Sequence, residues 1–229
     1  MKLKKSLLRR FQLYPVRSPA ARVATSNGIY LILDRPNFSR FSLKKIRSLV
    51  SGKEISLIQL RDKSSAKADI LKFALKLAKQ LASTKTFFIV NDYVDVAVAC
   101  GADGVHLGQD DLSLKQARKI LGKDKIIGLT CHNLSQASRA QKEGADYIGI
   151  GPLYATATKP GYPAIGLKAA AELKTKIKIP YFVIGNINEG NIKEITSAGF
   201  RRIAVCRAIL GSKDPQQVTK RLYKQLKKI

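Results

Sequence analysis

The sequence predicts an α/β protein in which eight parallel strands close into a single (β/α)8 TIM barrel. Short runs rich in β-branched residues alternate with longer segments whose apolar residues have helical spacing. Eight strand–helix units are the number that closes such a barrel, and a chain of 229 residues is long enough for one. The predicted strands are Gly28–Asp34, Ile55–Lys63, Thr86–Asp92, Gly104–Gln109, Lys125–Cys131, Tyr147–Gly151, Tyr181–Gly185 and Arg202–Cys206.

The segments between these strands are predicted to be helices. Leu71, Ala74, Leu75 and Ala78 illustrate the apolar spacing that places one face of a helix against a sheet. An open doubly wound sheet is the alternative fold, but no glycine-rich GxGxxG motif follows the first strand. Polar residues that precede helical runs are predicted N-caps. They are Ser42, Ser113, Ser135 and Asn188.

The first 27 residues are predicted to be a basic N-terminal extension, and residues 28–229 the catalytic barrel. The extension is rich in lysine and arginine, and the first acidic residue of the chain is Asp34. Such a composition also occurs in organelle transit peptides. A basic tail that stays on the protein, or a misassigned start, is the alternative. We therefore expect a cytoplasmic protein, with an organelle as the alternative location.

The net charge of +26 is compatible with nucleic-acid binding, with a membrane surface or with an anionic substrate, and the distribution of the charge decides between these. Lysine and arginine are spread over nearly all predicted helices and form no block with interleaved aromatic residues. This distribution favours a generally basic, solvated surface, whose positive field would favour small phosphorylated substrates. We expect no nucleic-acid or membrane partner, and assembly into a homo-oligomer stays open. No apolar run reaches the roughly 20 residues of a membrane span. Cys100, Cys131 and Cys206 lack metal-ligand spacing and are predicted to be reduced thiols.

The second predicted strand ends in a basic, polar face. Gln59, Arg61 and Lys63 are spaced by two and share one side of the strand, while Leu60 faces the opposite way. The carboxyl ends of barrel strands form the active face of a TIM barrel. Arginine and lysine at that position favour a phosphate or diphosphate ligand. A surface strand end with salt bridges is the alternative.

The third and fourth strands end in carboxylates. Asn91 and Asp92 end the third strand, and Asp110 and Asp111 follow the fourth. Mg²⁺ prefers oxygen ligands and is held by one or two carboxylates together with substrate phosphate oxygens. The sequence therefore predicts a Mg²⁺ site, although one of the two later aspartates could instead cap the next helix.

The remaining strand ends predict a second anion site. Thr130 and His132 end the fifth strand, and a loop with two hydroxyls and an ammonium follows the sixth. Loops after strands 7 and 8 commonly bind phosphate in such barrels. The residues concerned are Thr156, Thr158, Lys159, Asn186, Cys206 and Arg207.

These motifs, in this order and with this spacing, resemble the thiamine-phosphate synthase (thiamine phosphate pyrophosphorylase) family over about residues 28–222. The resemblance implies that a hydroxymethylpyrimidine diphosphate is joined to a thiazole phosphate, with diphosphate released and Mg²⁺ as cofactor. The motifs are Gln59-x-Arg61-x-Lys63, Asn91-Asp92, His106-x-x-Gln109-x-Asp111, Gly128-x-Thr130-x-His132, Gly151-Pro-x-Tyr-x-Thr156-x-Thr158-Lys159 and Gly185-x-Ile187.

The resemblance also implies roles for the residues that match. The pyrimidine diphosphate would be bound by Gln59, Arg61, Lys63, Asn91, Thr130 and Lys159, of which Arg61, Lys63, Thr130 and Lys159 would be catalytic. Asp92 and Asp111 would hold Mg²⁺. The thiazole phosphate would contact Thr156, Thr158, Asn186, Cys206 and Arg207.

Three positions depart from the usual family pattern. Asn186 replaces the second glycine of a Gly-Gly pair, Arg207 replaces a small hydroxyl residue, and Thr130 replaces a serine. Asparagine tolerates a positive φ better than most residues, so the backbone site at Asn186 can persist. The first two departures concern the thiazole-phosphate site and leave the diphosphate site unaffected.

Two other functions remain as alternatives. A metal-free thiazole tautomerase of the same fold would use His132 as its acid–base group. A basic nucleic-acid-binding protein would show salt-sensitive binding to DNA or RNA. Neither alternative accounts for a complete set of diphosphate and Mg²⁺ ligands at the strand ends.

Overall fold

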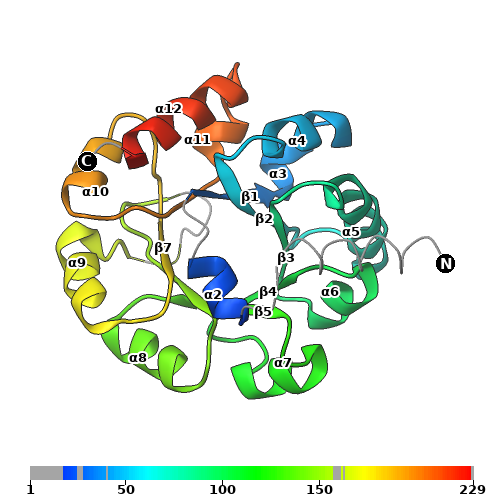
Figure 1. The fold of residues 1–229 in the computed structure, drawn as a ribbon, viewed down its shortest axis with the longest axis horizontal. Helices are drawn as coiled ribbons and strands as arrows, with labels where there is room; N and C mark the ends of the chain where they lie inside the picture. Colours follow the sequence, from blue (N-terminus) through cyan, green and yellow to red (C-terminus); the bar gives the residue numbers. More distant parts are fainter. Residues whose placement is uncertain (1–17, 25–27, 40, 157–160, 162, 228–229) are drawn as a thin grey trace.

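The computed structural model describes residues 18–24, 28–39, 41–156, 161 and 163–227. Eight parallel strands pair in sequence order, and β8 pairs with β1, so the sheet is a closed barrel (Figure 1). The predicted fold class is therefore confirmed. The strands are β1 (Ile29–Asp34), β2 (Ile55–Arg61), β3 (Phe87–Asn91), β4 (Gly104–Leu107), β5 (Ile126–Cys131), β6 (Tyr147–Ile150), β7 (Tyr181–Ile184) and β8 (Ile203–Val205).

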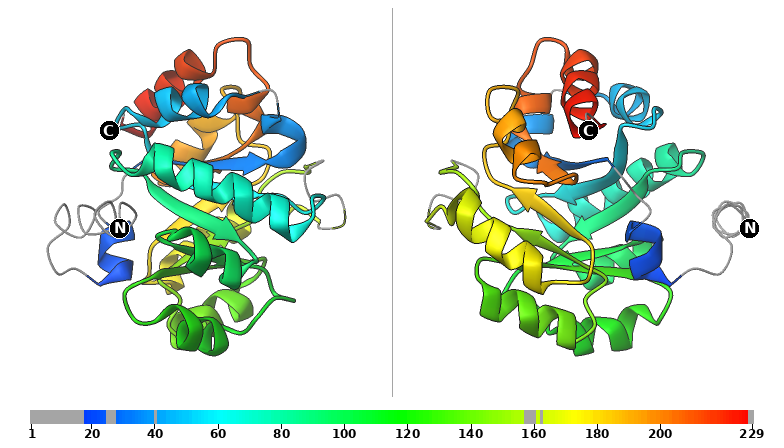
Figure 2. Two further views of the ribbon diagram at one scale, coloured as in Figure 1. Left: turned by 90° about the vertical axis from the view of Figure 1, so that its right-hand side faces the viewer. Right: turned by 60° about the vertical axis from the view of Figure 1, so that its left-hand side comes forward.

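Helices surround the barrel, as the side views in Figure 2 show. Within the described part of the chain, the helices α2 (Pro19–Ala24), α3 (Arg35–Phe38) and α11 (Arg207–Leu210) have four to six residues each. No described helix combines the length and the apolar character needed to cross a bilayer. The outer helices are α4 (Leu43–Val50), α5 (Lys67–Leu81), α6 (Val94–Cys100), α7 (Leu114–Leu121), α8 (Leu134–Lys142), α9 (Gly166–Lys176), α10 (Ile192–Ser197) and α12 (Pro215–Lys227).

Two of the four predicted N-caps are confirmed. The Ser42 hydroxyl accepts from the backbone N–H of Lys45, and Ser113 forms a capping box at the start of α7. The other two predictions are wrong. Ser135 lies inside α8, whose cap is Asn133, and Asn188 lies in a turn before α10. The Asn188 carboxamide oxygen accepts from the N–H of Gly190, which shows that an Asx turn can mimic a cap in sequence.

The alternation of side chains along the strands produces two apolar layers. One set, including Tyr30, Leu57 and Phe182, fills the barrel interior, and a larger set packs between the strands and the helices. Leu60 belongs to the outer layer, as predicted, while Gln59 points inward and hydrogen-bonds to Tyr30. Polar residues at inward positions near the strand ends therefore converge on one space.

Part of the segment predicted as an extension packs on the barrel. Helix α2 lies over the barrel opening in Figure 1. Val23 is fully buried among the interior side chains, and Arg202, which precedes β8, donates to the carbonyl of Ala24. These contacts lie at the amino ends of the strands. The boundary predicted at residue 27 thus assigns α2 to the extension. In the structure α2 instead packs on the barrel and closes the end at which the strands begin.

A truncation series tests this contribution of α2. A chain starting at residue 27 should have a free energy of unfolding about 2–3 kcal/mol lower than a chain starting at residue 18, because it lacks the buried Val23 side chain. The kcat at 25 °C should be the same in both chains, because α2 lies away from the strand carboxyl ends. Urea denaturation measures the difference in stability. Equal midpoints would show that α2 does not stabilise the barrel.

Candidate active site

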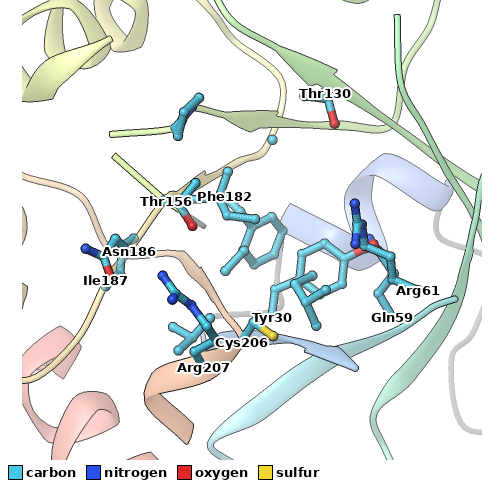
Figure 3. A pocket seen from close by; sticks show the side chains of 18 of the residues that line it. Tyr30, Gln59, Arg61, Thr130, Thr156, Phe182, Asn186, Ile187, Cys206 and Arg207 are labelled. Carbon is cyan, nitrogen blue, oxygen red and sulfur yellow. The ribbon is translucent and has the colours of Figure 1, made fainter. Parts of the chain in front are cut away.

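A cavity lies at the carboxyl ends of the strands, where the sequence predicts the site. Figure 3 shows Gln59 and Arg61 on one side of it and Thr156, Asn186 and Arg207 on the other, with the rings of Tyr30 and Phe182 between them. The cavity therefore has two polar sides separated by an aromatic floor. Other predicted site residues that line it are Asn91, Thr130 and Cys206.

Arg61 is held at the cavity by a carboxylate that the sequence analysis did not assign. The Arg61 guanidinium forms an ion pair with Asp34 at the end of β1, and the Asn37 amide donates to the same carboxylate at 3.1 Å. Asp34 is buried, so it fixes one edge of the guanidinium. An arginine has five donors, and one such pair leaves others for a phosphate ligand. Asp34 could have been found because it ends a strand beside β2.

Lys63 lies beside the predicted metal carboxylates, in a cluster that is not part of the described cavity lining. It follows β2, and its Nζ lies 3.0 Å from Oδ2 of Asp92. Burial raises the pKa of Asp92, and the facing carboxyl of Asp111 raises it further, whereas Lys63 opposes both effects. Two carboxyls that face each other repel when both are ionised, and a divalent cation between them would remove that repulsion. The structure thus brings together Lys63, Asp92 and Asp111, as the sequence predicts.

Local backbone geometry orients both aspartates. Asp92 has a φ of 62°, a left-handed conformation that aspartate adopts more readily than most residues. The Asp111 carboxylate accepts from the N–H of Gly108 at 2.6 Å. Asp110 is exposed, and α7 is capped by Ser113, so neither aspartate serves as the helix cap that the sequence left open. Among the described residues, no group of three or more His, Cys, Asp or Glu side chains could hold a metal.

The opposite side of the cavity comes from β7, β8 and the loop after β6. Asn186 has a φ of 51°, as expected for an asparagine at a glycine position. Arg207 is the first residue of α11 and lines the cavity with Thr156. Burial raises the pKa of the Cys206 thiol to about 12, so Cys206 stays a neutral wall residue. Thr158 and Lys159 lie outside the described residues.

Gly185 lets the loop after β6 approach the end of β7. Its φ is 117°, and a Cβ at this position would lie 2.6 Å from Cα of Pro152 and 2.5 Å from N of Leu153. Only glycine fits such a position. The backbone of Asn186 is thereby brought beside the loop that carries Thr156.

The two histidines also line the cavity. His132 Nδ1 donates to the carbonyl of Gly151 at 2.5 Å, which anchors the ring to the loop after β6. His106 is buried beneath Thr130 and contacts its hydroxyl at 2.8 Å. The sequence motifs contain His106 without assigning it a role, and they do not include its partner Tyr147. The inward periodicity of β4 and β6 is the signal that could have identified both.

Comparison with known proteins matches this site and fold to one family. The family model described as thiamine monophosphate synthase matches residues 29–209. A thiamine-phosphate synthase of Gloeobacter violaceus is 44% identical over 165 residues, which are 72% of this chain and 48% of that protein. One of Clostridium acetobutylicum is 38% identical over 201 residues, 87% of this chain and 95% of that protein. The chain thus spans about half the length of some curated relatives and nearly all of others.

A solved structure agrees with these matches. Thiamine phosphate pyrophosphorylase from Pyrococcus furiosus superposes with a TM-score of 0.78 at 32% identity, covering 90% of this chain and 97% of that one. The matched region begins with β1 and ends in α11, so it includes all eight strands and every described residue of the cavity. The chain belongs to the thiamine monophosphate synthase family.

Proposed function

We propose that this protein is a thiamine-phosphate synthase, a transferase of thiamine biosynthesis. It would join 4-amino-2-methyl-5-hydroxymethylpyrimidine diphosphate to thiazole phosphate and release diphosphate. The observation that carries the proposal is the two-sided cavity. One side of the cavity holds Arg61 and the other holds Arg207, while Lys63, Asp92 and Asp111 form a cluster after β2, β3 and β4 that is not part of the described cavity lining. Two phosphorylated substrates therefore have separate places around one apolar floor.

The reaction is a substitution at the pyrimidine methylene carbon. The bond from this carbon to the diphosphate oxygen breaks, the diphosphate leaves with the electron pair, and the thiazole nitrogen forms the new bond. Arg61 and Lys63 stabilise the negative charge that develops on the leaving group. Arg207, Thr156 and the backbone at Asn186 hold the thiazole phosphate, which places the ring nitrogen opposite the leaving group. By resemblance, Lys159 and Thr158 complete these two sets.

Asp92 and Asp111 are the residues that would hold Mg²⁺. The two carboxylates repel each other, and the one ammonium of Lys63 balances only one of their two negative charges. Two carboxylates leave most of the coordination shell for water and phosphate oxygens, as Mg²⁺ prefers. When bound, the ion supplies further charge neutralisation to the diphosphate.

The thiazole tautomerase remains the second candidate, because His132 lines the cavity. A metal-free tautomerase would not require the cluster of Lys63, Asp92 and Asp111. The proposed function therefore gains its support from Lys63, Asp92 and Asp111, and the tautomerase gains its support from His132 alone.

An assay with both phosphorylated substrates, with and without Mg²⁺, tests the proposal. We expect thiamine phosphate and diphosphate to form in equal amounts with Mg²⁺, and turnover to be lost with a chelator. Isomerisation of a thiazole carboxylate without metal would instead identify a tautomerase. Absence of coupling with every divalent cation tried, in a folded protein, would contradict the proposed function.

A further inference from the structure

A chain of four hydrogen bonds crosses the barrel interior at the floor of the cavity. It starts at the Gln59 carboxamide, whose nitrogen donates to the Tyr30 hydroxyl at 2.5 Å. The Tyr30 and Tyr147 hydroxyls are 2.7 Å apart, and the Tyr147 hydroxyl lies 3.0 Å from Nδ1 of His106. Nε2 of His106 then lies 2.8 Å from the Thr130 hydroxyl. We call these five residues the relay.

The relay connects two predicted substrate-binding residues through three residues that have no assigned role. Gln59 comes from β2 and Thr130 from β5, and both line the cavity. Tyr30, Tyr147 and His106 come from β1, β6 and β4. Five strands thus contribute one inward side chain each to a single polar line inside an otherwise apolar interior.

Packing keeps the relay in place. Tyr30 is 2% exposed and Tyr147 is fully buried, and both rings pack edge-on against Phe182. A Cβ at Gly128 would lie 2.1 Å from Cζ of Tyr147, so glycine at this position makes room for the ring. A buried hydroxyl without a hydrogen-bond partner costs about 1–3 kcal/mol, so each hydrogen bond of the relay is strongly favoured.

Both tyrosines remain neutral. Burial raises the pKa of Tyr30 and of Tyr147 above the ordinary value. Each hydroxyl therefore has one proton to donate, and each link along the relay determines the direction of the next.

The direction follows from the Gln59 end. Tyr30 accepts from Gln59, so its own buried proton finds an acceptor if it is directed to the Tyr147 hydroxyl. In this assignment Tyr147 donates to Nδ1 of His106, the histidine proton is on Nε2, and Nε2 donates to Thr130. The Thr130 hydroxyl proton is left for the cavity, and so is the Gln59 carboxamide oxygen.

We propose that the relay determines which side chain of the pyrimidine site donates a hydrogen bond and which accepts one. Tyr30, Tyr147 and His106 are then positioning residues. Thr130 then presents a donor and Gln59 an acceptor. The ligand that fits is a heterocycle with an N–H donor facing Gln59 and an acceptor facing Thr130. An aminopyrimidine carries both groups. This assignment to the pyrimidine substrate rests on the proposed function, whereas the direction of the relay does not.

The first test measures the histidine tautomer in the ligand-free protein. The chain has two histidines, so ¹⁵N NMR yields two imidazole spin systems, and a His132→Gln variant assigns them. We expect His106 to be neutral at pH 7.5 with its proton on Nε2. A proton on Nδ1, or on both nitrogens, would overturn the direction of the relay. Because no turnover is required, this result stands or fails apart from the proposed function.

The second test interrupts the relay at its centre. A Tyr147→Phe variant should raise KM for the pyrimidine diphosphate about three- to tenfold, the effect of one lost neutral hydrogen bond, and leave KM for the thiazole phosphate unchanged. His106 should change to a mixture of tautomers in the same variant. Tyr223→Phe on the outer helix α12 is the matched control and should change none of these values.

A purely structural role would give a different pattern. Tyr147→Phe would then lower the midpoint of thermal unfolding and leave both KM values and the His106 tautomer unchanged, which would overturn the proposal. Tyr30→Phe removes the link between Gln59 and Tyr147 and serves as the second variant if Tyr147→Phe does not fold. The same rise in KM for the pyrimidine diphosphate is expected from it.

Discussion

Replacing Asp92 with asparagine should lower the Mg²⁺-dependent kcat/KM on the order of a hundred- to a thousandfold and leave the barrel folded. Asp92 faces Asp111 beside Lys63, and we propose that the two carboxylates hold the cation. Metal-assisted stabilisation of a leaving anion is worth several kcal/mol, and each 1.4 kcal/mol is tenfold in rate. Asparagine is chosen because it also tolerates the φ of 62° at this position.

Asp110→Asn is the matched control for this experiment. Asp110 is exposed and lies next to Asp111 in the chain, so its loss should leave kcat/KM within twofold. Steady-state rates at several Mg²⁺ concentrations, together with circular dichroism to check folding, give the comparison. A folded Asp92→Asn protein with a wild-type Mg²⁺ dependence would contradict the metal assignment.

Replacing Arg207 with alanine should raise KM for the thiazole phosphate about ten- to a hundredfold. Arg207 lines the cavity opposite Arg61 and can bind phosphate through paired N–H donors. A lost charge-assisted hydrogen bond costs roughly 1.5–3 kcal/mol, which corresponds to that range. KM for the pyrimidine diphosphate should hardly change, because its predicted ligands lie on other strands. Varying each substrate in turn separates the two constants.

The control for Arg207 is Arg221→Ala. Arg221 pairs with Glu189 on the outer surface, and its loss should leave both KM values unchanged. If the Arg207→Ala protein keeps a wild-type KM for the thiazole phosphate, the phosphate would depend on Thr156, Thr158 and backbone amides instead.

The order of the elements could be predicted from local pattern. Each predicted strand matches an observed one, and their ends differ by at most two residues. The reason is that a buried parallel strand needs a short run of apolar, often β-branched residues, and the helices between strands need a different period. All barrel strands run in the same direction, so their carboxyl ends lie at one end of the barrel. Predicting those ends was therefore sufficient to place Gln59, Asn91, Thr130 and Arg207 around one cavity.

The predicted caps show where local pattern fails. Asn133 and Ser135 are both good caps by residue type, and the structure uses Asn133, whose side chain accepts from the backbone N–H of Gln136. The extension shows the same limit. Its basic composition predicts nothing about Val23, which is buried because the open end of the barrel is next to it.

By itself, the sequence determined the fold class, the strand order and the residue types at the strand ends, because these depend on spacing along the chain. Only the tertiary structure decided which carboxylate pairs with Arg61. Asp34 does so because the pairing of β1 with β2 brings the ends of these strands together. The tertiary structure also decided the path of the relay, since Tyr30 and Tyr147 are 117 residues apart and touch only across the barrel interior. Such contacts depend on the registers and inward faces of several strands at once, which no local pattern specifies.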